Sequence, residues 1–262
     1  MKNKVLCIVP LYNKINFLGY SIGSVLNQTD GDITMVIVDD CSTDGSYEWC
    51  QEYVGHFPNV HILRNDENKG CYQSRNRGLN YAIENNIEFD YYTVTDPDDI
   101  SMEGRFRDLI QVFNEHPEVL VVQNPYYRYN IDTKEIISTN YDAMEGSAWF
   151  AREVLDIIGY WDNTIRMSGD TEYIIRLYNH FAKQNIDYNQ YVGKMTVPMV
   201  YCLMDNEEQN LTSLYTADHP KRKAVFHYVD EFTSHAKLED CYYGFENTGH
   251  PYSGMGAPSF GN

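Results

Sequence analysis

The chain has 262 residues, of which 43% are hydrophobic, and this suits one large domain, with or without an elaborated C-terminal part. Its net charge of −18 argues against a nucleic-acid partner, because phosphate polyanions are attracted by positive charge. No apolar run approaches the roughly 18 residues of a membrane span, and no signal-peptide core follows Met1. We therefore expect a soluble cytoplasmic protein and leave peripheral membrane contact open. The six cysteines form no CxxC pair, which favours free thiols in a reducing compartment.

The first hundred residues alternate between apolar runs and helical patterns. Residues 5–9 are continuously apolar, which is typical of a strand that is buried on both faces. We expect further strands at residues 34–38, 60–63 and 89–94, and helices at residues 15–28, from about residue 45, and at residues 71–85. This alternation predicts βαβ units and a mostly parallel sheet with helices on both faces, which is an α/β fold.

The second half of the chain gives a less regular pattern. We expect helices at residues 105–114, 149–158 and from about 168, strands at 119–122 and 197–203, an amphipathic helix at 218–236 and an irregular tail at 241–262. Residues 123–142 are polar and rich in tyrosine and show no clear period.

Acidic residues follow two of the predicted strands. Asp39 and Asp40 come after residues 34–38, and Asp96, Asp98 and Asp99 come after residues 89–94. The carboxyl ends of parallel strands meet at one edge of the sheet, which is where open α/β sheets bind ligands. Turn chemistry alone also explains one acidic turn, but two at the same edge favour a site, and such oxygen ligands suit Mg²⁺ or Mn²⁺.

Five blocks of the sequence, in order, resemble the family 2 inverting glycosyltransferases of the GT-A fold. They are residues 8–13 (IVPLYN), 36–46 (VIVDDCSTDGS), 68–78 (NKGCYQSRNRG), 95–99 (TDPDD) and, more weakly, 168–177 (SGDTEYIIRL). The resemblance implies a Rossmann-like, mostly parallel sheet flanked by helices, with a C-terminal helical extension. It implies a glycosyltransferase domain at residues 1–215, divided into a nucleotide-binding half (1–100) and an acceptor-side half (101–215), followed by a helix and tail at 216–262.

The resemblance also implies an activity and the residues of a donor site. The activity is metal-dependent, inverting transfer from a nucleotide sugar, expected to be a UDP-sugar, to a hydroxyl of a glycan or glycolipid in polysaccharide biosynthesis. Pro10, Tyr12 and Asp40 would form the nucleotide pocket, with Tyr12 against the uracil and Asp40 accepting a hydrogen bond from the base N–H. Arg75 would approach the base or the phosphates.

Three further aspartates carry the chemistry that the resemblance implies. Asp96 would reach the ribose or the metal, and Asp98 would ligate Mn²⁺ or Mg²⁺ between the donor phosphates, as in a DxD motif. Asp170 matches the aspartate that the family uses as catalytic base, which takes the proton of the acceptor hydroxyl. A capping role at the start of a helix is the alternative for Asp170.

The chain departs from the family in two places. Residues 201–206 (YCLMDN) contain no histidine where many members place one near the metal. His219, His227 and His235 are candidates for a third metal ligand only by their place in the sequence, and surface or helix-packing roles explain them as well. Gly169 stands where many members have glutamate.

Two other functions remain open, namely a nucleotide-sugar-binding module without catalysis and a sugar nucleotidyltransferase. The presence of Asp170 and of both DxD carboxylates speaks against the first, and the absence of a glycine-rich phosphate loop after residues 5–9 speaks against the second. A Rossmann oxidoreductase would need GxGxxG after that strand, and the chain lacks it. The sequence names neither the sugar nor the acceptor.

Overall fold

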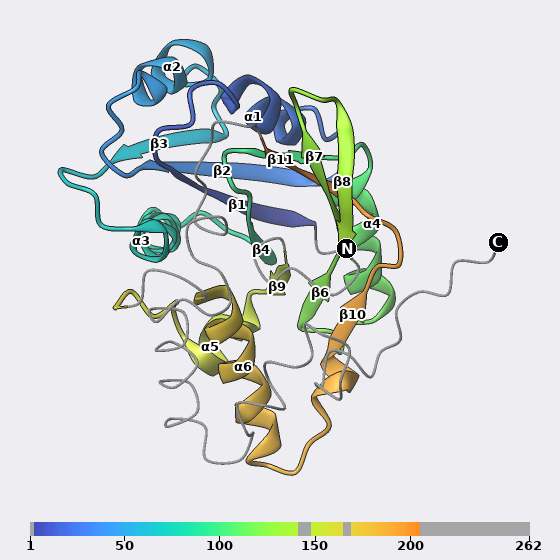
Figure 1. Cartoon of the computed structure of the whole chain (residues 1–262). Helices are drawn as coiled ribbons and strands as arrows, with labels where there is room; N and C mark the ends of the chain where they lie inside the picture. The colour runs from blue at the N-terminus through green and yellow to red at the C-terminus, as the bar shows by residue number, and fades with distance from the viewer. Residues whose placement is uncertain (1–2, 141–147, 165–168, 205–262) are drawn as a thin grey trace.

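The computed structural model describes residues 3–140, 148–164 and 169–204 (Figure 1). The predicted helix at 218–236, the tail at 241–262 and the three late histidines lie outside these residues. No helix among the described residues is long and apolar enough to cross a membrane.

A seven-stranded sheet in the order β10-β6-β9-β4-β1-β2-β3 forms the centre of the molecule. Its strands are β1 (Lys4–Leu11), β2 (Asp32–Asp39), β3 (Val60–Arg64), β4 (Tyr91–Val94), β6 (Val121–Gln123), β9 (Trp149–Ala151) and β10 (Val192–Lys194). β1 pairs in parallel with β2 and β4, and β2 with β3, whereas β9 runs antiparallel between β4 and β6. The predicted mostly parallel sheet is therefore confirmed.

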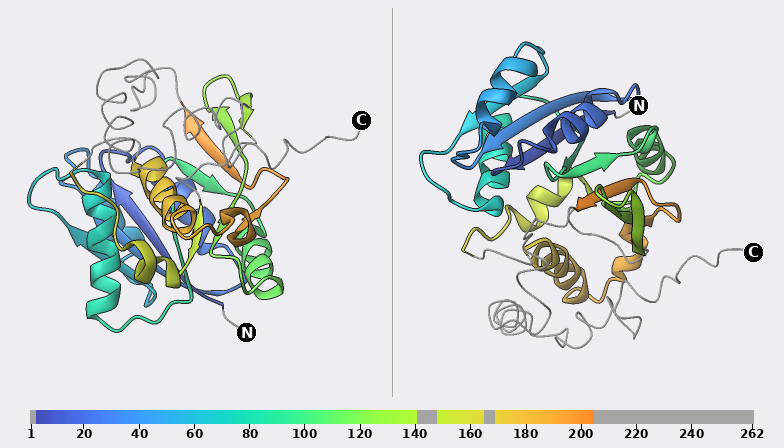
Figure 2. Two further views of the ribbon diagram at one scale, coloured as in Figure 1. Left: turned by 90° about the horizontal axis from the view of Figure 1, so that it is seen from below. Right: turned by 45° about the horizontal axis from the view of Figure 1, so that its top comes forward.

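Helices cover both faces of this sheet. They are α1 (Leu18–Leu26), α2 (Ser46–Tyr53), α3 (Cys71–Glu84), α4 (Arg105–Glu115), α5 (Glu153–Ile158) and α6 (Gly169–Ala182), and a short 3-10 helix, η2 (Tyr188–Tyr191), precedes β10. Figure 1 shows α1 and α2 on one side and α3 on the other, and the left view of Figure 2 looks onto the side that α3, α5 and α6 cover.

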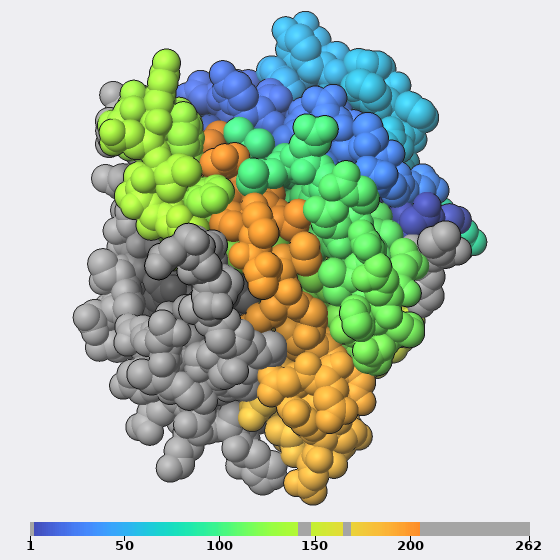
Figure 3. Space-filling view, turned by 90° about the vertical axis from the view of Figure 1, so that its right-hand side faces the viewer, coloured from blue at the N-terminus to red at the C-terminus, as the bar shows by residue number. Residues whose placement is uncertain are grey.

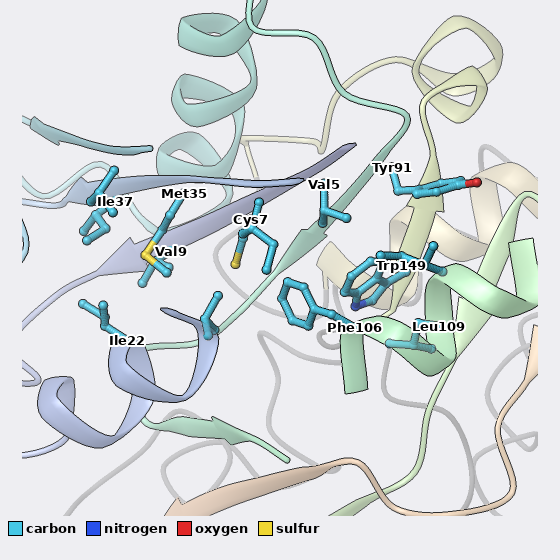
Figure 4. Close-up of a cluster of buried hydrophobic side chains, with 14 of the residues drawn as sticks. Val5, Cys7, Val9, Ile22, Met35, Ile37, Tyr91, Phe106, Leu109 and Trp149 are labelled. Carbon is cyan, nitrogen blue, oxygen red and sulfur yellow. The ribbon is translucent and has the colours of Figure 1, made fainter. Parts of the chain in front are cut away.

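Side chains along β1 point alternately to the two faces of the sheet, so this strand contributes to the hydrophobic core on each face. On one face, Cys7 and the residues two positions before and after it pack with α1 and α4. Phe106 and Trp149 lie next to them, and the centroids of these two rings are 4.6 Å apart in an edge-to-face arrangement (Figure 4). Leu6 and Ile8 pack on the opposite face with α3 and α6. Each fully buried side chain of this size stabilises the fold by about 1.5–3 kcal/mol, which explains why residues 5–9 are apolar without interruption.

A second, four-stranded sheet in the order β5-β11-β7-β8 adjoins the first. Its strands are β5 (Asp99–Ser101), β7 (Tyr126–Asn130), β8 (Glu135–Asn140) and β11 (Val200–Met204). In Figure 3 the β7–β8 hairpin stands out at the margin of the molecule beside β11. The hairpin corresponds to the stretch in which the sequence showed no period, because a register shift between Arg128 and Tyr129 interrupts the alternation.

The helix predicted at residues 149–158 is wrong for its first three residues. Trp149, Phe150 and Ala151 form β9, and only Glu153–Ile158 are helical, as α5. All three residues of β9 are buried between β4 and β6, and a short apolar run of this kind does not distinguish a strand from a helix.

Candidate functional site

The carboxyl ends of β1, β2 and β4 meet at one edge of the large sheet, as the sequence predicts. Leu11 pairs with Asp39, and Ile8 pairs with Val94. Pro10 is buried within β1, whereas Tyr12, directly after the strand, is 45% exposed. The exposed Tyr12 ring thus follows β1 at the same edge as Asp40, whose N–H donates to the Leu11 carbonyl at 2.7 Å.

Asp40 is already engaged by the loop that leads into α3. Its side chain is buried, with 3% of the residue exposed, and its Oδ1 accepts hydrogen bonds from Asn65 Nδ2 at 2.6 Å and from the Lys69 backbone N–H at 2.8 Å. Oδ2 accepts from the Gly70 N–H at 2.7 Å. A carboxylate has about four acceptor positions, so Oδ2 keeps one for a further donor. The role of Asp40 toward a base stays a prediction.

The turn that carries the DxD motif is fixed from two sides. The Asp99 N–H donates to the Asp96 carbonyl at 3.0 Å, and Ser21 Oγ of α1 donates to the same carbonyl at 3.1 Å. The Leu203 N–H of β11 donates to the Asp98 carbonyl at 3.0 Å. These bonds orient the two carboxylates of the motif without using their side-chain oxygens.

Arg75 connects the DxD motif to α6. Its guanidinium, with 3% of the side chain exposed, forms an ion pair through Nη1 with Asp170 Oδ1, and its Nη2 lies 3.5 Å from Asp96 Oδ1. The rings of Tyr72 and Trp161 flank it, with their centroids 5.0 and 5.7 Å from Cζ. Three residues singled out from the sequence, on three separate elements, therefore meet in one cluster.

Asp170 lies inside α6, one residue after Gly169, at which the helix begins. Its carboxylate faces α3, where it meets Arg75 and the hydroxyl of Tyr72. The residue that caps a helix precedes its first turn, so these contacts favour a role other than capping.

Negative charge accumulates at the end of β4. Partial burial raises the pKa of Asp96 to about 6, and the carboxylates of Asp98 and Asp170 add to this rise while Arg75 opposes it. Burial, together with Asp98 and Asp96, also raises the pKa of Asp99 well above its usual range. A divalent cation placed between these groups would relieve their mutual repulsion.

Lys14 is a residue of the site that sequence reasoning missed. Its Nζ lies 2.9 Å from Asp98 Oδ2 and 5.5 Å from the centroid of the Phe17 ring. Its backbone N–H donates to Ser46 Oγ at 3.0 Å, so the segment after β1 is held against the start of α2. The sequence feature that indicates its place in the site is its position three residues after the end of the buried strand β1.

The donor set at this edge fits Mg²⁺ or Mn²⁺ when the substrate supplies the remaining ligands. Magnesium sites in proteins commonly combine one or two carboxylates with waters and substrate phosphates, and Asp96 and Asp98 supply such carboxylates. Among the described residues no group of three or more histidine, cysteine or acidic side chains could hold a metal ion without such help. With the ion bound, Asp98 would contact the ion in place of Lys14, and Asp96 would contact the ion in place of Arg75.

Comparisons with solved structures support the fold. In the crystal structure of S. aureus TarS 1-349 in complex with UDP-GlcNAc, the fold matches with a TM-score of 0.69 at 17% identity, over 93% of this chain and 72% of that one. The mannosyltransferase PcManGT from Pyrobaculum calidifontis, in complex with GDP-Man and Mn2+, matches with a TM-score of 0.62 at 15% identity, over 97% and 74% of the two chains. These likenesses confirm the predicted GT-A fold.

Two relatives in sequence match this chain over only part of their own length. The minor teichoic acid biosynthesis protein GgaB of Bacillus subtilis is 37% identical over 123 residues, which are 46% of this chain and 13% of GgaB. Glycosyltransferase GlyG of Streptococcus pneumoniae is 29% identical over 150 residues, 57% of this chain and 44% of GlyG. The chain thus spans less than half the length of either relative. The model of the family described as "Glycosyl transferase family 2" matches residues 6–182, so the chain belongs to that family.

Proposed function

We propose that the chain is a metal-dependent, inverting glycosyltransferase that moves a sugar from a UDP-sugar to a hydroxyl of a glycan or glycolipid acceptor. The observation that carries the proposal is the cluster in which Arg75 joins Asp96 of the DxD motif to Asp170 of α6. A metal-binding carboxylate beside a candidate base is what direct displacement at a sugar carbon requires. The UDP-GlcNAc held by TarS and the teichoic acid role in the name of GgaB support this donor and a polymer acceptor.

On the donor side, Tyr12 offers an exposed ring on which the uracil stacks. The remaining acceptor position of Asp40 receives the base N–H. Asp98 and Asp96 would hold Mn²⁺ or Mg²⁺, which would supply positive charge to stabilise the departing diphosphate. Lys14 and Arg75, released from the two carboxylates, add positive charge at the same place, which matters for a protein of net charge −18.

On the acceptor side, Asp170 takes the proton of the attacking hydroxyl. A general base needs a fixed orientation, and the ion pair with Arg75 helps to fix the carboxylate of Asp170. Attack on the face opposite the diphosphate inverts the anomeric carbon, so an α-linked donor gives a β-linked product. The division into a nucleotide-binding half (1–100) and an acceptor-side half (101–215) remains a prediction.

A donor-hydrolysis screen tests the proposal and its rivals. Nucleotide release is measured from UDP-glucose, UDP-GlcNAc, UDP-galactose and GDP-mannose, each with Mn²⁺, Mg²⁺ or EDTA. We expect UDP release from at least one UDP-sugar, which stops in EDTA and in Asp98→Asn. Binding of UDP-sugars without release in any condition, and without transfer to added glycans, would favour the binding module. Formation of pyrophosphate from UTP and a sugar phosphate would favour the nucleotidyltransferase.

A further inference from the structure

The start of α6 is shaped around one side chain of α3. A Cβ atom on Gly169 would lie 2.6 Å from Tyr72 Cζ and 2.7 Å from both Cε atoms, which is closer than Cβ atoms approach non-bonded atoms in folded proteins. The Gly169 N–H donates to the Tyr72 hydroxyl at 2.8 Å. The tyrosine therefore fills the space that a side chain at position 169 would need, and it binds the backbone directly before Asp170.

The Tyr72 ring has little freedom to move. It is 4% exposed and belongs to the apolar cluster between the sheet and the helices α3 and α6. Burial, reinforced by the nearby charge of Asp170, raises the pKa of Tyr72 well above its usual value, so the hydroxyl keeps its proton. The oxygen accepts from Gly169, which leaves that proton for another acceptor.

Asp170 offers that acceptor, because its Oδ2 lies 3.4 Å from the Tyr72 hydroxyl. This distance is longer than that of a settled O–H···O hydrogen bond, but bonds of catalytic groups commonly shorten when substrate binds. Tyr72 and Arg75 are three residues apart on α3 and so lie on one face of the helix. Arg75 contacts Oδ1 of Asp170 and the Tyr72 hydroxyl lies near Oδ2, so each side chain contacts a different oxygen of this carboxylate.

We propose that Tyr72 is a positioning residue for Asp170, and that Gly169 is required to admit its ring. The proposal rests on the proposed function of Asp170 as base. The terminal torsion of an aspartate is only weakly restricted, so an ion pair to one oxygen leaves the carboxylate able to turn. A second contact at the other oxygen fixes its plane toward the acceptor. The chain would in this way orient its base without the glutamate that many family members carry at position 169.

The variant Tyr72→Phe removes the hydroxyl and keeps the ring. A misplacement of about 1 Å costs roughly 100-fold in rate, so we expect kcat to fall by about 10- to 100-fold. The donor KM and the binding of UDP and metal should stay close to wild type, because Asp170 acts after the donor has bound. The melting temperature should fall by a few degrees, because the buried Gly169 N–H loses its acceptor. Tyr81→Phe is the matched control, since that hydroxyl lies on the same helix but contacts His61 Nδ1 at 3.2 Å.

A double-mutant cycle with Asp170→Asn shows through which residue Tyr72 acts. We expect Tyr72→Phe to lower kcat in the wild type and to have almost no effect in the Asp170→Asn background. A normal kcat in Tyr72→Phe, or an equal loss in both backgrounds, would overturn the positioning role and leave the proposed function intact. Full activity of Asp170→Asn would instead overturn the assignment of the base, and the positioning role with it.

Discussion

Replacing Arg75 by methionine tests the physical basis of the whole cluster. The change removes a buried cation and leaves Asp96 and Asp170 without their shared partner. Removing one member of a buried ion pair costs about 3–5 kcal/mol of folding free energy. The Asp96 and Asp170 side chains keep 36% and 24% of their surface exposed, so water solvates the freed carboxylates in part. We therefore expect a loss of about 3 kcal/mol, at the lower end of that range.

Thermal unfolding and urea titration of the metal-free protein at pH 8 measure this loss. For a domain of this size each kcal/mol shifts the melting temperature by about 2–4 °C, so Arg75→Met should melt about 6–12 °C below wild type. Arg77→Met is the matched control on the same helix. The Arg77 guanidinium donates to the Arg64 carbonyl at 2.7 Å and also to Asn65 Oδ1, and these two hydrogen bonds contribute about 1 kcal/mol each, which is less than the loss expected for the buried cation. Equal melting temperatures for the two variants would refute the reasoning about the buried ion pair.

Three further predictions follow from the same structure. Asp98→Asn should abolish metal-dependent turnover and should weaken donor binding in Mn²⁺, as measured by calorimetry. The control Asp108→Asn on α4, whose partner Arg107 is at the surface, should change neither. Normal metal-dependent turnover in Asp98→Asn would show that Asp98 is not a metal ligand. UDP should bind more tightly than CDP by about 1–3 kcal/mol, because the free acceptor position of Asp40 suits a base N–H, and tighter binding of CDP or GDP would contradict that role. Burial raises the pKa of Cys7 to about 11 and that of Cys50 to about 12, while unfolded thiols ionise near pH 8.5. The unfolded state therefore binds fewer protons above that pH, and stability to urea should fall between pH 8 and 9.5, by up to about 1.4 kcal/mol per pH unit for each thiol; a flat profile would contradict their burial as neutral groups.

The sequence predicts best where one physical requirement determines the residue type. Residues 5–9 must be apolar because β1 is covered on both faces, and this made the central strand recognisable. Asp40 and Asp96 lie within two residues of the ends of parallel strands, so the sequence predicts their place at one edge of the sheet.

The contacts between side chains of the site could not be predicted from the sequence. Nothing in the chain indicates that Lys14 meets Asp98, or that Arg75 contacts two carboxylates where phosphates were expected, because such pairs depend on the packing of separate elements. The sequence predicts helix for the residues of β9, because three buried apolar residues in a row show neither a helical nor a strand periodicity. The space between Gly169 and Tyr72 likewise became visible only when α3 and α6 were placed together.

The transfer rate of Asp170→Asn tests the central claim most directly. Asparagine keeps the shape of aspartate but cannot accept the proton of the acceptor hydroxyl. Transfer is measured with a labelled donor found in the screen, alongside UDP and Mn²⁺ affinity and the melting temperature. If Asp170 is the base, the variant should fold and bind as wild type while transfer falls by roughly 10²–10⁴-fold. If the variant transfers sugar at the wild-type rate, Asp170 is not the base and the account of the site is wrong.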